Sequence, residues 1–393
     1  MNEPQSNGEP QPKNHQYRVI WIVAILVFLI IGVSWLIYWR GWGQFKEATN
    51  DAYVNGNMIV IKPFEAGIIV TVLADNAQMV EKGQPLAELN RHEFEIALEK
   101  AKADLADAVR EVVKMFLKTE ELQSKIQVYK AKVVRARLDY EHRADLVSDG
   151  SVSREDFEHS ETELMAAIAA LDETEKEWAE AVADIQNTTP FTHPKVEKAI
   201  AMVRRAYLAL QRCTIVAPVS GIITQRKAQV GQWVGTSEPL MALVPLEEIW
   251  VDANFREVEL KNIRIGQRVE LIADMYGHDV VFRGRIAGLN PGTGSVFSIL
   301  PPQNATGNWI KIIQRVPVKV NLHSEELKDH PLVLGLSMTV KVDTHERSGR
   351  RLPEAGLDRP IYQTDVYEDE LEGVEELIEE ILSQNCSCEI QTL

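Results

Sequence analysis

The stretch IKPFEAGIIVTVLADNAQMVEKGQPLAEL, which runs from Ile61 to Leu89, determines the fold that we predict for the rest of the chain. Short apolar runs separated by Gly and Pro are typical of β-strands joined by tight turns. The stretch predicts half of a small β-domain. The second half does not follow Leu89, so it has to come from another part of the chain.

A second copy of this pattern begins at Gly221. Gly67-Ile68-Ile69 matches Gly221-Ile222-Ile223, and thirteen residues after each glycine stands a valine, Val80 or Val234, with a Pro-Leu pair five residues further on. Three landmarks at identical offsets favour a true repeat over chance similarity between unrelated strand pairs. We predict one β-sandwich built from residues 59–90 and 213–245, with turn residues Gly67, Pro85, Gly221 and Pro239.

Residues 91–212, which separate the two copies, are predicted to be helical. Apolar residues recur at alternating steps of four and three, which indicates the narrow seam of a coiled coil rather than the wider apolar face of a helical bundle. The predicted seam includes Leu98, Leu105, Val112, Leu122, Ile126, Val133, Leu164, Leu171 and Trp178.

Two arms of nearly equal length follow from the breaks in this pattern. Residues 91–147 and 154–211 give arms of 57 and 58 residues, with a tip near 148–153 and Ser153 as the N-cap of the return arm. Pro190 and Pro194 predict a kink or break in the return arm. Two equal arms that leave and re-enter one β-domain predict an antiparallel helical hairpin.

An apolar segment near the N-terminus predicts a membrane anchor. Residues 19–39 hold 21 residues without a charge, enough to span a bilayer as a helix, after a polar segment at 1–18. A cleavable signal peptide is the competing interpretation, but its apolar region is usually shorter and ends in small residues, whereas this one ends in aromatic residues. The flanking positive charges do not fix the orientation.

The C-terminal third changes to short alternating strands. Residues 246–345, with a strand from 49–58, predict a small antiparallel β-barrel. The acidic tail, 346–393, carries 13 Asp and Glu against 4 Arg. Residues 367–382 could form an amphipathic helix that docks, but a solvated and partly ordered extension is the favoured interpretation because such tails bury little apolar surface.

Composition and motifs argue against several other functions. A net charge of −16 argues against a nucleic-acid partner. The pair Cys386 and Cys388 has no neighbouring ligands for a metal, and the glycine-rich GLNPGTGS at 288–295 lacks the Lys-Ser/Thr ending of a phosphate-binding loop. Histidines are scattered and no nucleophile motif occurs, so we predict neither an enzyme nor a cofactor or metal site.

Together these parts resemble the membrane fusion proteins, the HlyD-like periplasmic adaptors of efflux and secretion systems. TNDAYVNGN at 49–57, WVDANF at 250–255 and GTGSVFSILPPQNATGNWIKIIQRVPVKV at 292–320 are similar to the EmrA-type multidrug-efflux branch. The resemblance covers residues 15–345 and implies an elongated multidomain α+β chain. Its parts would be one N-terminal transmembrane helix, a split lipoyl- or biotinyl-like sandwich, a coiled-coil hairpin and a barrel near the membrane.

The resemblance also implies partners and a location. A trimer or hexamer would join a major-facilitator drug:proton antiporter of the bacterial inner membrane to a TolC-like outer-membrane channel, and would contribute to antibiotic resistance. The N-terminus would be cytoplasmic and the bulk of the chain periplasmic. Family tips carry Arg, Leu and Ser, to which Leu146 and Ser153 correspond, while His142 stands at the arginine position and Arg143 is displaced by one.

Two other functions remain as alternatives. The chain could be the adaptor of an ABC-type protein secretion system, or a membrane-bound biotin or lipoyl carrier. The barrel motifs disfavour the first. The second requires a cofactor lysine at an exposed turn, but after Leu89 the chain runs into the predicted hairpin instead.

Overall fold

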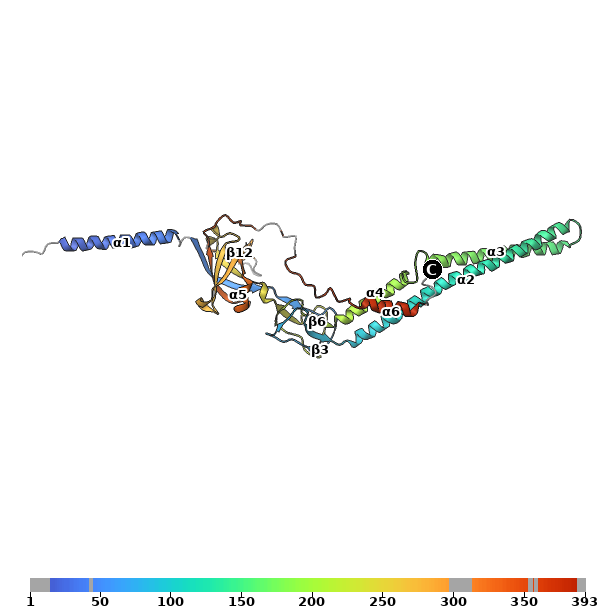
Figure 1. The fold of residues 1–393 in the computed structure, drawn as a ribbon, viewed down its shortest axis with the longest axis horizontal. Helices are drawn as coiled ribbons and strands as arrows, with labels where there is room; N and C mark the ends of the chain where they lie inside the picture. Colours follow the sequence, from blue (N-terminus) through green and yellow to red (C-terminus); the bar gives the residue numbers. More distant parts are fainter. Residues whose placement is uncertain (1–14, 42–44, 297–312, 353–355, 357–359, 387–393) are drawn as a thin grey trace, which may run out of the picture. The chain divides into compact units, whose positions relative to one another are not determined.

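The structure is a computed structural model that describes residues 15–41, 45–296, 313–352, 356 and 360–386. The chain divides into two units, which are described separately: residues 1–59 with 243–362, and residues 60–242 with 363–393. Figure 1 gives the order of the elements. Most of the N-terminal segment 1–18, Cys388, and residues 297–312 of the quoted motif 292–320 lie outside the described residues.

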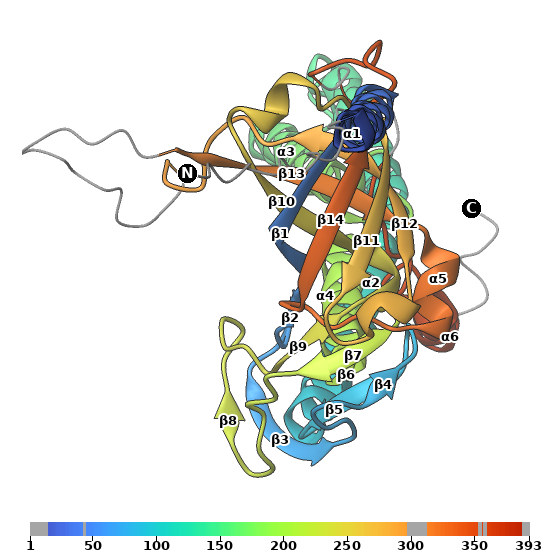
Figure 2. The same cartoon turned by 90° about the vertical axis from the view of Figure 1, so that its left-hand side faces the viewer.

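In the first unit six antiparallel strands close a barrel in the order β1-β10-β13-β12-β11-β14 (Figure 2). β10 shows why these residues form strands, because its buried positions are all apolar and its outward positions, apart from Trp250, are polar. The core includes Phe255, Leu271, Phe282 and Val340. The strands are β1 Lys46–Gly56, β10 Ile249–Arg256, β11 Arg268–Ala273, β12 Phe282–Leu289, β13 Arg315–Leu322 and β14 Ser337–Asp343, with the short helix α5 at Ser324–Asp329.

β1 begins three residues before the predicted start of its strand. Lys46, Glu47 and Ala48 pair with Asp343, Val342 and Lys341 of β14, so tertiary pairing extends the strand toward the N-terminal helix. That helix, α1 (His15–Gly41), has one stretch long and apolar enough to cross a membrane, Val19–Tyr38, with a mean hydropathy of 2.9 and none of its window buried. The described chain resumes at Phe45, four residues after the end of α1 at Gly41.

The second unit contains two four-stranded sheets, β2-β9-β7-β4 and β6-β5-β3-β8. The two sequence copies interlock reciprocally in them: Gly67 of β3 pairs with Val234 of β8, and Gly221 of β7 pairs with Val80 of β4. The matched landmarks of the repeat are therefore each other's partners. The strands are β2 Ile59–Ile61, β3 Gly67–Val72, β4 Met79–Val80, β5 Pro85–Leu89, β6 Thr214–Val216, β7 Gly221–Thr224, β8 Trp233–Val234 and β9 Met241–Val244.

A long helical hairpin leaves this domain between two paired strands. β5 and β6 are antiparallel neighbours, and the amide of Leu89 donates to the carbonyl of Cys213 at 2.9 Å where the hairpin begins and ends. The outward arm is the single helix α2, His92–Val147, and the return arm consists of α3, Arg154–Ile185, and α4, Pro194–Gln211. The hairpin predicted from the sequence is confirmed.

The break in the return arm has a local cause. Pro194 occupies the first turn of α4, where its missing amide hydrogen costs nothing. His193 caps α4 by accepting from the amide of Lys195 at 3.2 Å, and its Nε2 lies 3.1 Å from the carbonyl oxygen of Asp184 near the end of α3. The buried imidazole thus bridges the two helices.

The acidic tail differs from the favoured expectation of a solvated extension. Its helix α6, Val374–Asn385, lies along α2 and α4 (Figure 1) and buries Val374 and Ile378, and Cys386 directly after the helix is also buried. It can order because α2 offers a second apolar stripe, Val109 and Val113, beside the seam. Tail and hairpin therefore form a three-helix core at the base of the hairpin.

Equivalent positions of the two copies provide a test of the interlocked repeat. Ala77 and Gly231 lie ten residues after Gly67 and Gly221, both have positive φ (63° and 82°), and their amides donate to Ile223 and Ile69 at 2.9 and 2.8 Å. Left-handed backbone strains alanine but not glycine. We expect Ala77→Gly to raise the free energy of unfolding of the two-sheet domain by about 0.5–1 kcal/mol, and Gly231→Ala to lower it by about 1 kcal/mol.

Native-state hydrogen exchange of the amides in β3 and β7, in the full chain, measures both effects. No heavy atom lies within 4 Å of a Cβ added at Gly231, so this variant reports the backbone alone. Equal unfolding free energies for the wild type and both variants would contradict the proposed equivalence.

Candidate functional site

The tip of the hairpin is the first candidate site, and it exposes an apolar side chain. Leu146 is 44% exposed in the last turn of α2, just before the turn at 148–150 that Gly150 closes with a positive φ of 71°. His142, one turn earlier, is also exposed. The tip presents an aliphatic side chain to its surroundings.

Two of the four predicted tip residues instead hold the tip together. The hydroxyl of Ser153 accepts from the amide of Asp156 at 3.1 Å and donates to its carboxylate at 2.6 Å, as an N-cap does. The guanidinium of Arg143 donates to the carbonyl oxygen of Asp156 at 3.2 Å, across the two arms. Ser153 and Arg143 therefore fix the turn, which leaves Leu146 and His142 as the outward side chains.

The predicted seam residues differ in how much of each side chain is buried. Leu98, Leu105, Val112, Leu122 and Ile126 of α2 are buried. Val133 of α2 and Leu164, Leu171 and Trp178 of α3 are half-buried. On α3 the buried positions are the polar Ser160 and Thr174, whose hydroxyls donate to their own helix backbone at 2.7 and 2.9 Å. The distal arm is therefore a thin two-helix structure, unlike the base.

The base of the hairpin carries a second candidate surface, formed with the tail. The Arg204 guanidinium binds the Glu375 carboxylate through two hydrogen bonds of 2.7 and 2.8 Å, and Arg212 binds Glu370 similarly at 3.1 and 2.8 Å. The Tyr207 hydroxyl donates to the carbonyl of Glu372 at 2.7 Å. Sequence reasoning missed these residues, although the second stripe on α2 could have indicated a third helix.

The tail also reaches the two-sheet domain. Lys82 forms an ion pair with Asp365, and the Thr364 hydroxyl donates to the carbonyl of Pro218 at 2.6 Å. Tyr367 packs edge-on against Phe64 with ring centroids 5.4 Å apart, and burial raises the pKa of this tyrosine. The tail is therefore fixed to both the two-sheet domain and the hairpin base.

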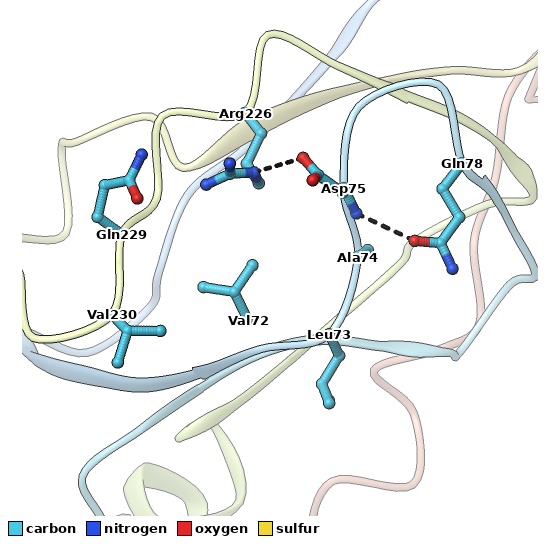
Figure 3. A pocket seen from close by; sticks show the side chains of 8 residues that line it. All are labelled: Val72, Leu73, Ala74, Asp75, Gln78, Arg226, Gln229 and Val230. Carbon is cyan, nitrogen blue, oxygen red and sulfur yellow. Dashed lines mark hydrogen bonds and ion pairs between the residues drawn. The ribbon is translucent and has the colours of Figure 1, made fainter.

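A shallow cavity of about 290 Å³ lies at the junction of the two repeat copies (Figure 3). Arg226 of the second copy binds Asp75 of the first at 2.7 Å, and Val72 and Val230 line the apolar side. The hydrogen bond from Arg226 holds the pKa of the Asp75 carboxyl below its usual value. These polar groups bind each other, and this arrangement serves to clamp the copies together.

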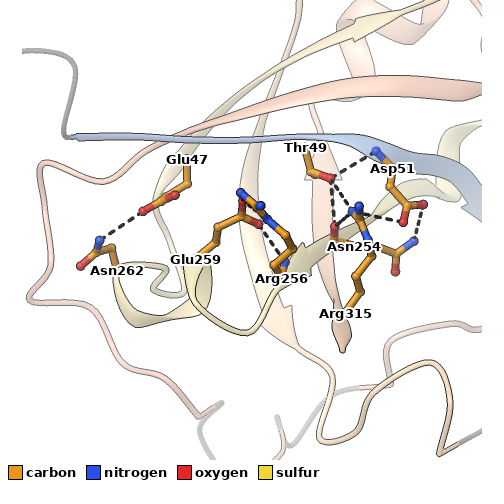
Figure 4. A network of polar contacts seen from close by, with 8 residues as sticks. All are labelled: Glu47, Thr49, Asp51, Asn254, Arg256, Glu259, Asn262 and Arg315. Atoms are coloured by element: carbon orange, nitrogen blue, oxygen red, sulfur yellow. Dashed lines mark hydrogen bonds and ion pairs between the residues drawn. The ribbon is translucent and has the colours of Figure 1, made fainter. Parts of the chain in front are cut away.

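In the barrel a polar network fixes the start of β1 (Figure 4). The Thr49 hydroxyl donates to the carbonyl of Asn254 at 2.9 Å, and Asp51 binds both Asn254 at 3.0 Å and Arg315 at 3.3 Å. Further toward the start of the strand, Asn262 donates to Glu47 at 3.2 Å. The strand that follows α1 is therefore anchored to β10 and β13 by side chains as well as by its backbone.

The described residues hold no arrangement of the kinds that bind metals. Among them no group of three or more His, Cys, Asp or Glu could hold a metal ion. Cys213 is buried, and this burial raises the pKa of its thiol to about 11, which makes it a weak nucleophile. Cys386 belongs to the hydrophobic core of the hairpin base.

Comparisons with known proteins give the family. Residues 93–213 match a family described as "EMRA, alpha-helical hairpin domain". The chain is 39% identical to the multidrug export protein EmrA of Escherichia coli K12 over 90% of each chain. It is 38% identical to EmrA of Haemophilus influenzae over 92% of this chain and 93% of that one. The solved structure of the periplasmic adaptor protein EmrA is 19% identical, with a TM-score of 0.39 over 76% of this chain and 99% of that chain.

An apolar N-terminal helix, a closed six-stranded barrel and a long helical hairpin define a membrane fusion adaptor, a non-enzymatic class of protein. Within that class, the chain belongs to the EmrA family of multidrug export adaptors, as the sequence identities over nine-tenths of its length establish.

The ion pairs of the tail predict how its docking depends on pH. Hydrogen bonds from Arg204 and Lys82 lower the pKa of Glu375 and of Asp365 below their unfolded values of 4.5 and 3.8. A carboxyl with a lowered folded pKa stabilises the folded state above its unfolded pKa and loses that contribution as the pH falls through its folded pKa. We expect α6 to stay docked from pH 7 to about 5 and to loosen progressively below about 4.5.

Hydrogen-exchange protection of the α6 amides, corrected for intrinsic rates, measures this docking in the full chain. Glu375→Gln should reduce the pH dependence, whereas Glu379→Gln, at an exposed position on the same helix, should leave it unchanged. Ile378→Ala should weaken docking at every pH by about 2–4 kcal/mol, since this side chain is 3% exposed. Protection that is the same at pH 3 and pH 7 would contradict the role of the ion pairs.

Proposed function

We propose that this protein is the periplasmic adaptor of a tripartite multidrug efflux system. It would link a major-facilitator drug:proton antiporter of the inner membrane to a TolC-like outer-membrane channel, and work as a trimer or hexamer. The observation that carries this proposal is the 39% identity to a multidrug export protein over 90% of both chains. The same relatives favour a drug exporter over an ABC-type secretion system as the inner-membrane partner.

The N-terminal part supports the inner-membrane end of the proposal. Val19–Tyr38 has no buried residues in its apolar window, so it needs an apolar environment that the described chain does not supply. The barrel begins a few residues later and is fixed at that point by the network of Thr49, Asp51 and Arg315. We infer a single-pass anchor with the N-terminus in the cytoplasm and the barrel next to the membrane.

The hairpin supports the outer end. A 56-residue helix such as α2 extends about 84 Å at 1.5 Å per residue, a length useful for reaching a distant partner. Leu146 at its end is 44% exposed, and the neighbouring Arg143 and Ser153 are occupied in holding the turn. We infer that Leu146 and His142 contact the outer channel.

The two-sheet domain is proposed to be lipoyl-like in architecture but to carry no cofactor. In a carrier domain the lysine would stand in a turn between the two halves, and here the hairpin connects β5 to β6 instead. A rigid mount then replaces the mobile cofactor arm.

Replacing Leu146 with Asp tests the tip. A carboxylate in an apolar channel contact loses its hydration, so export should fall to the background of a strain without the adaptor, while expression stays at the wild-type level. Drug resistance and dye efflux in a strain complemented with each variant measure this. Val128→Asp is the matched control, because Val128 is 55% exposed on the same helix away from the tip. Wild-type resistance with Leu146→Asp would overturn the assignment of the tip.

A cysteine at the tip tests the location. Asp149→Cys places a thiol at an exposed turn position, while Cys213 and Cys386 are buried. With Cys388→Ser in the background, a membrane-impermeant maleimide should label Asp149→Cys in cells whose outer membrane alone has been permeabilised. Labelling that requires lysis of the inner membrane would show that the hairpin is cytoplasmic and contradict the proposed orientation.

A further inference from the structure

Cationic side chains gather at the end of the barrel where β1 begins. Three register pairs locate this end: Lys46 with Asp343, Val269 with Val342, and Arg268 with Arg285. Here the segment that follows β14 meets the loop between the 3-10 turn at Glu259–Lys261 and β11. The two segments and the neighbouring β12 supply the members of what we call the cationic cluster: Lys261, Arg264, Arg268, Arg285, Arg347 and Arg351.

The backbone beneath this cluster is held in place. The amide of Ile265 donates to the carbonyl of Arg350 at 3.0 Å, and the buried side-chain amide of Gln267 donates to the carbonyl of Glu346 at 2.7 Å. Gly349 packs so closely that an added Cβ would lie 2.7 Å from the carbonyl oxygen of Ile265. The two segments thus form one surface, so their charges keep fixed positions relative to each other.

In the described part of the chain, the charges of the cluster have no carboxylate partners. Its arginines donate to backbone carbonyls instead: Arg264 to Ile263 at 2.7 Å, Arg285 to Gly266 at 3.1 Å and Arg351 to Lys261 at 3.2 Å. Within the part of the chain that the structure describes, none of the six members forms an ion pair.

The carboxylates at the same end of the barrel bind residues outside the cluster. Glu259 binds Arg256, Asp51 binds Arg315 and Glu47 binds Asn262 (Figure 4). Asp343 is bound by His345, and Glu346 by the hydroxyl of Ser348 at 3.1 Å. None of these carboxylates pairs with a member of the cluster. Glu47 and Glu346 keep their negative charge because their partners are neutral, but the six cluster members outnumber them, so this end stays positive in a chain whose net charge is −16.

The excess positive charge affects both a strand pair and the pKa of an arginine. Arg268 and Arg285 stand directly opposite each other in the β11–β12 ladder, where like charges destabilise a strand pair. Burial lowers the pKa of Arg264, and the positive charges of Arg351 and Arg347 lower it further. A bound anion would relieve both effects, since guanidinium groups bind phosphate through paired hydrogen bonds.

Chain connectivity keeps this surface close in sequence to the end of α1. The amide of Thr344 donates to the carbonyl of Phe45 at 2.8 Å, and the Arg347 guanidinium lies 5.3 Å from the centroid of the Phe45 ring. Phe45 follows Gly41, the last residue of α1, by four residues, which can span at most about 14 Å. If α1 is the anchor proposed above, Arg347 lies within reach of the lipid headgroups that border the hydrocarbon core.

We propose that the cationic cluster binds the phosphate groups of anionic phospholipids at the membrane surface. This inference rests on the proposed anchoring by α1. The lipid contact would hold the barrel against the bilayer at a second point besides α1.

The test uses the full chain reconstituted into nanodiscs of phosphatidylcholine alone or mixed with phosphatidylglycerol. An arginine-selective dicarbonyl reagent is applied, and modification is mapped by peptide mass spectrometry. Arg285, Arg347 and Arg351 should react several-fold more slowly in the anionic discs, and high salt should remove the difference. Arg135 and Arg137, exposed on the hairpin, should react equally in both.

A variant set gives a second measurement. R285Q/R347Q/R351Q should weaken binding of the detergent-solubilised chain to phosphatidylglycerol micelles by about fivefold for each charge removed. R135Q/R137Q/R205Q, with the same change in net charge on the hairpin, should weaken it less than twofold. Equal losses in the two triple variants would reduce the effect to net charge and overturn the proposal.

The remaining outcomes separate this inference from the proposed function. A chain that does not co-migrate with nanodiscs contradicts the anchoring and overturns both. A chain that co-migrates but whose arginines react equally in the two kinds of disc leaves the anchor intact and overturns the lipid site. Protection that appears only when an inner-membrane exporter is added assigns the cluster to a protein partner and also overturns it.

Discussion

The reciprocal pairing of Gly67 with Val234 and of Gly221 with Val80 is the constraint on which the second unit depends. Because each copy supplies the partner strands of the other, neither half can form its sheets alone. The pairing also brings β5 beside β6, so the long insertion must leave and return at one point. Two arms of nearly equal length are then a geometric requirement, since unequal arms would leave part of one helix without its seam partner.

Features set by local sequence were accessible without the structure, and features set by packing between distant segments were not. The limits of α2 and α3, the Ser153 cap and the break before Pro194 follow from periodicity, capping chemistry and proline. The docking of α6 depends on Val109 and Val113 of a helix more than 250 residues earlier in the chain, and the acidic composition of the tail concealed it. The clue was the wider apolar face of α2 over its first half, which a two-helix seam does not need.

The tip illustrates the same division at the level of single side chains. Its position at 148–153 follows from the helix pattern, but the division of labour among its residues does not. Ser153 and Arg143 are polar residues of the kind that contact partners, yet their hydrogen bonds to Asp156 show that they stabilise the turn. Only the structure distinguishes these two residues from Leu146. The packing of the hairpin does not explain why this apolar side chain is exposed.

Arginine side chains have different roles in the two units, and the role depends on whether the guanidinium binds a carboxylate or a backbone carbonyl. In the second unit Arg204, Arg212 and Arg226 each bind a carboxylate of the same unit, so their charges are neutralised inside the fold and serve to join segments. At the barrel end Arg264, Arg285 and Arg351 donate to carbonyl oxygens, which satisfy hydrogen bonds but leave the net charge in place. A guanidinium held by carbonyls is preorganised and still cationic, which is the state that a phosphate-binding surface requires. Residue counts alone cannot distinguish these two kinds of arginine, because a chain of net charge −16 can still present a locally positive face.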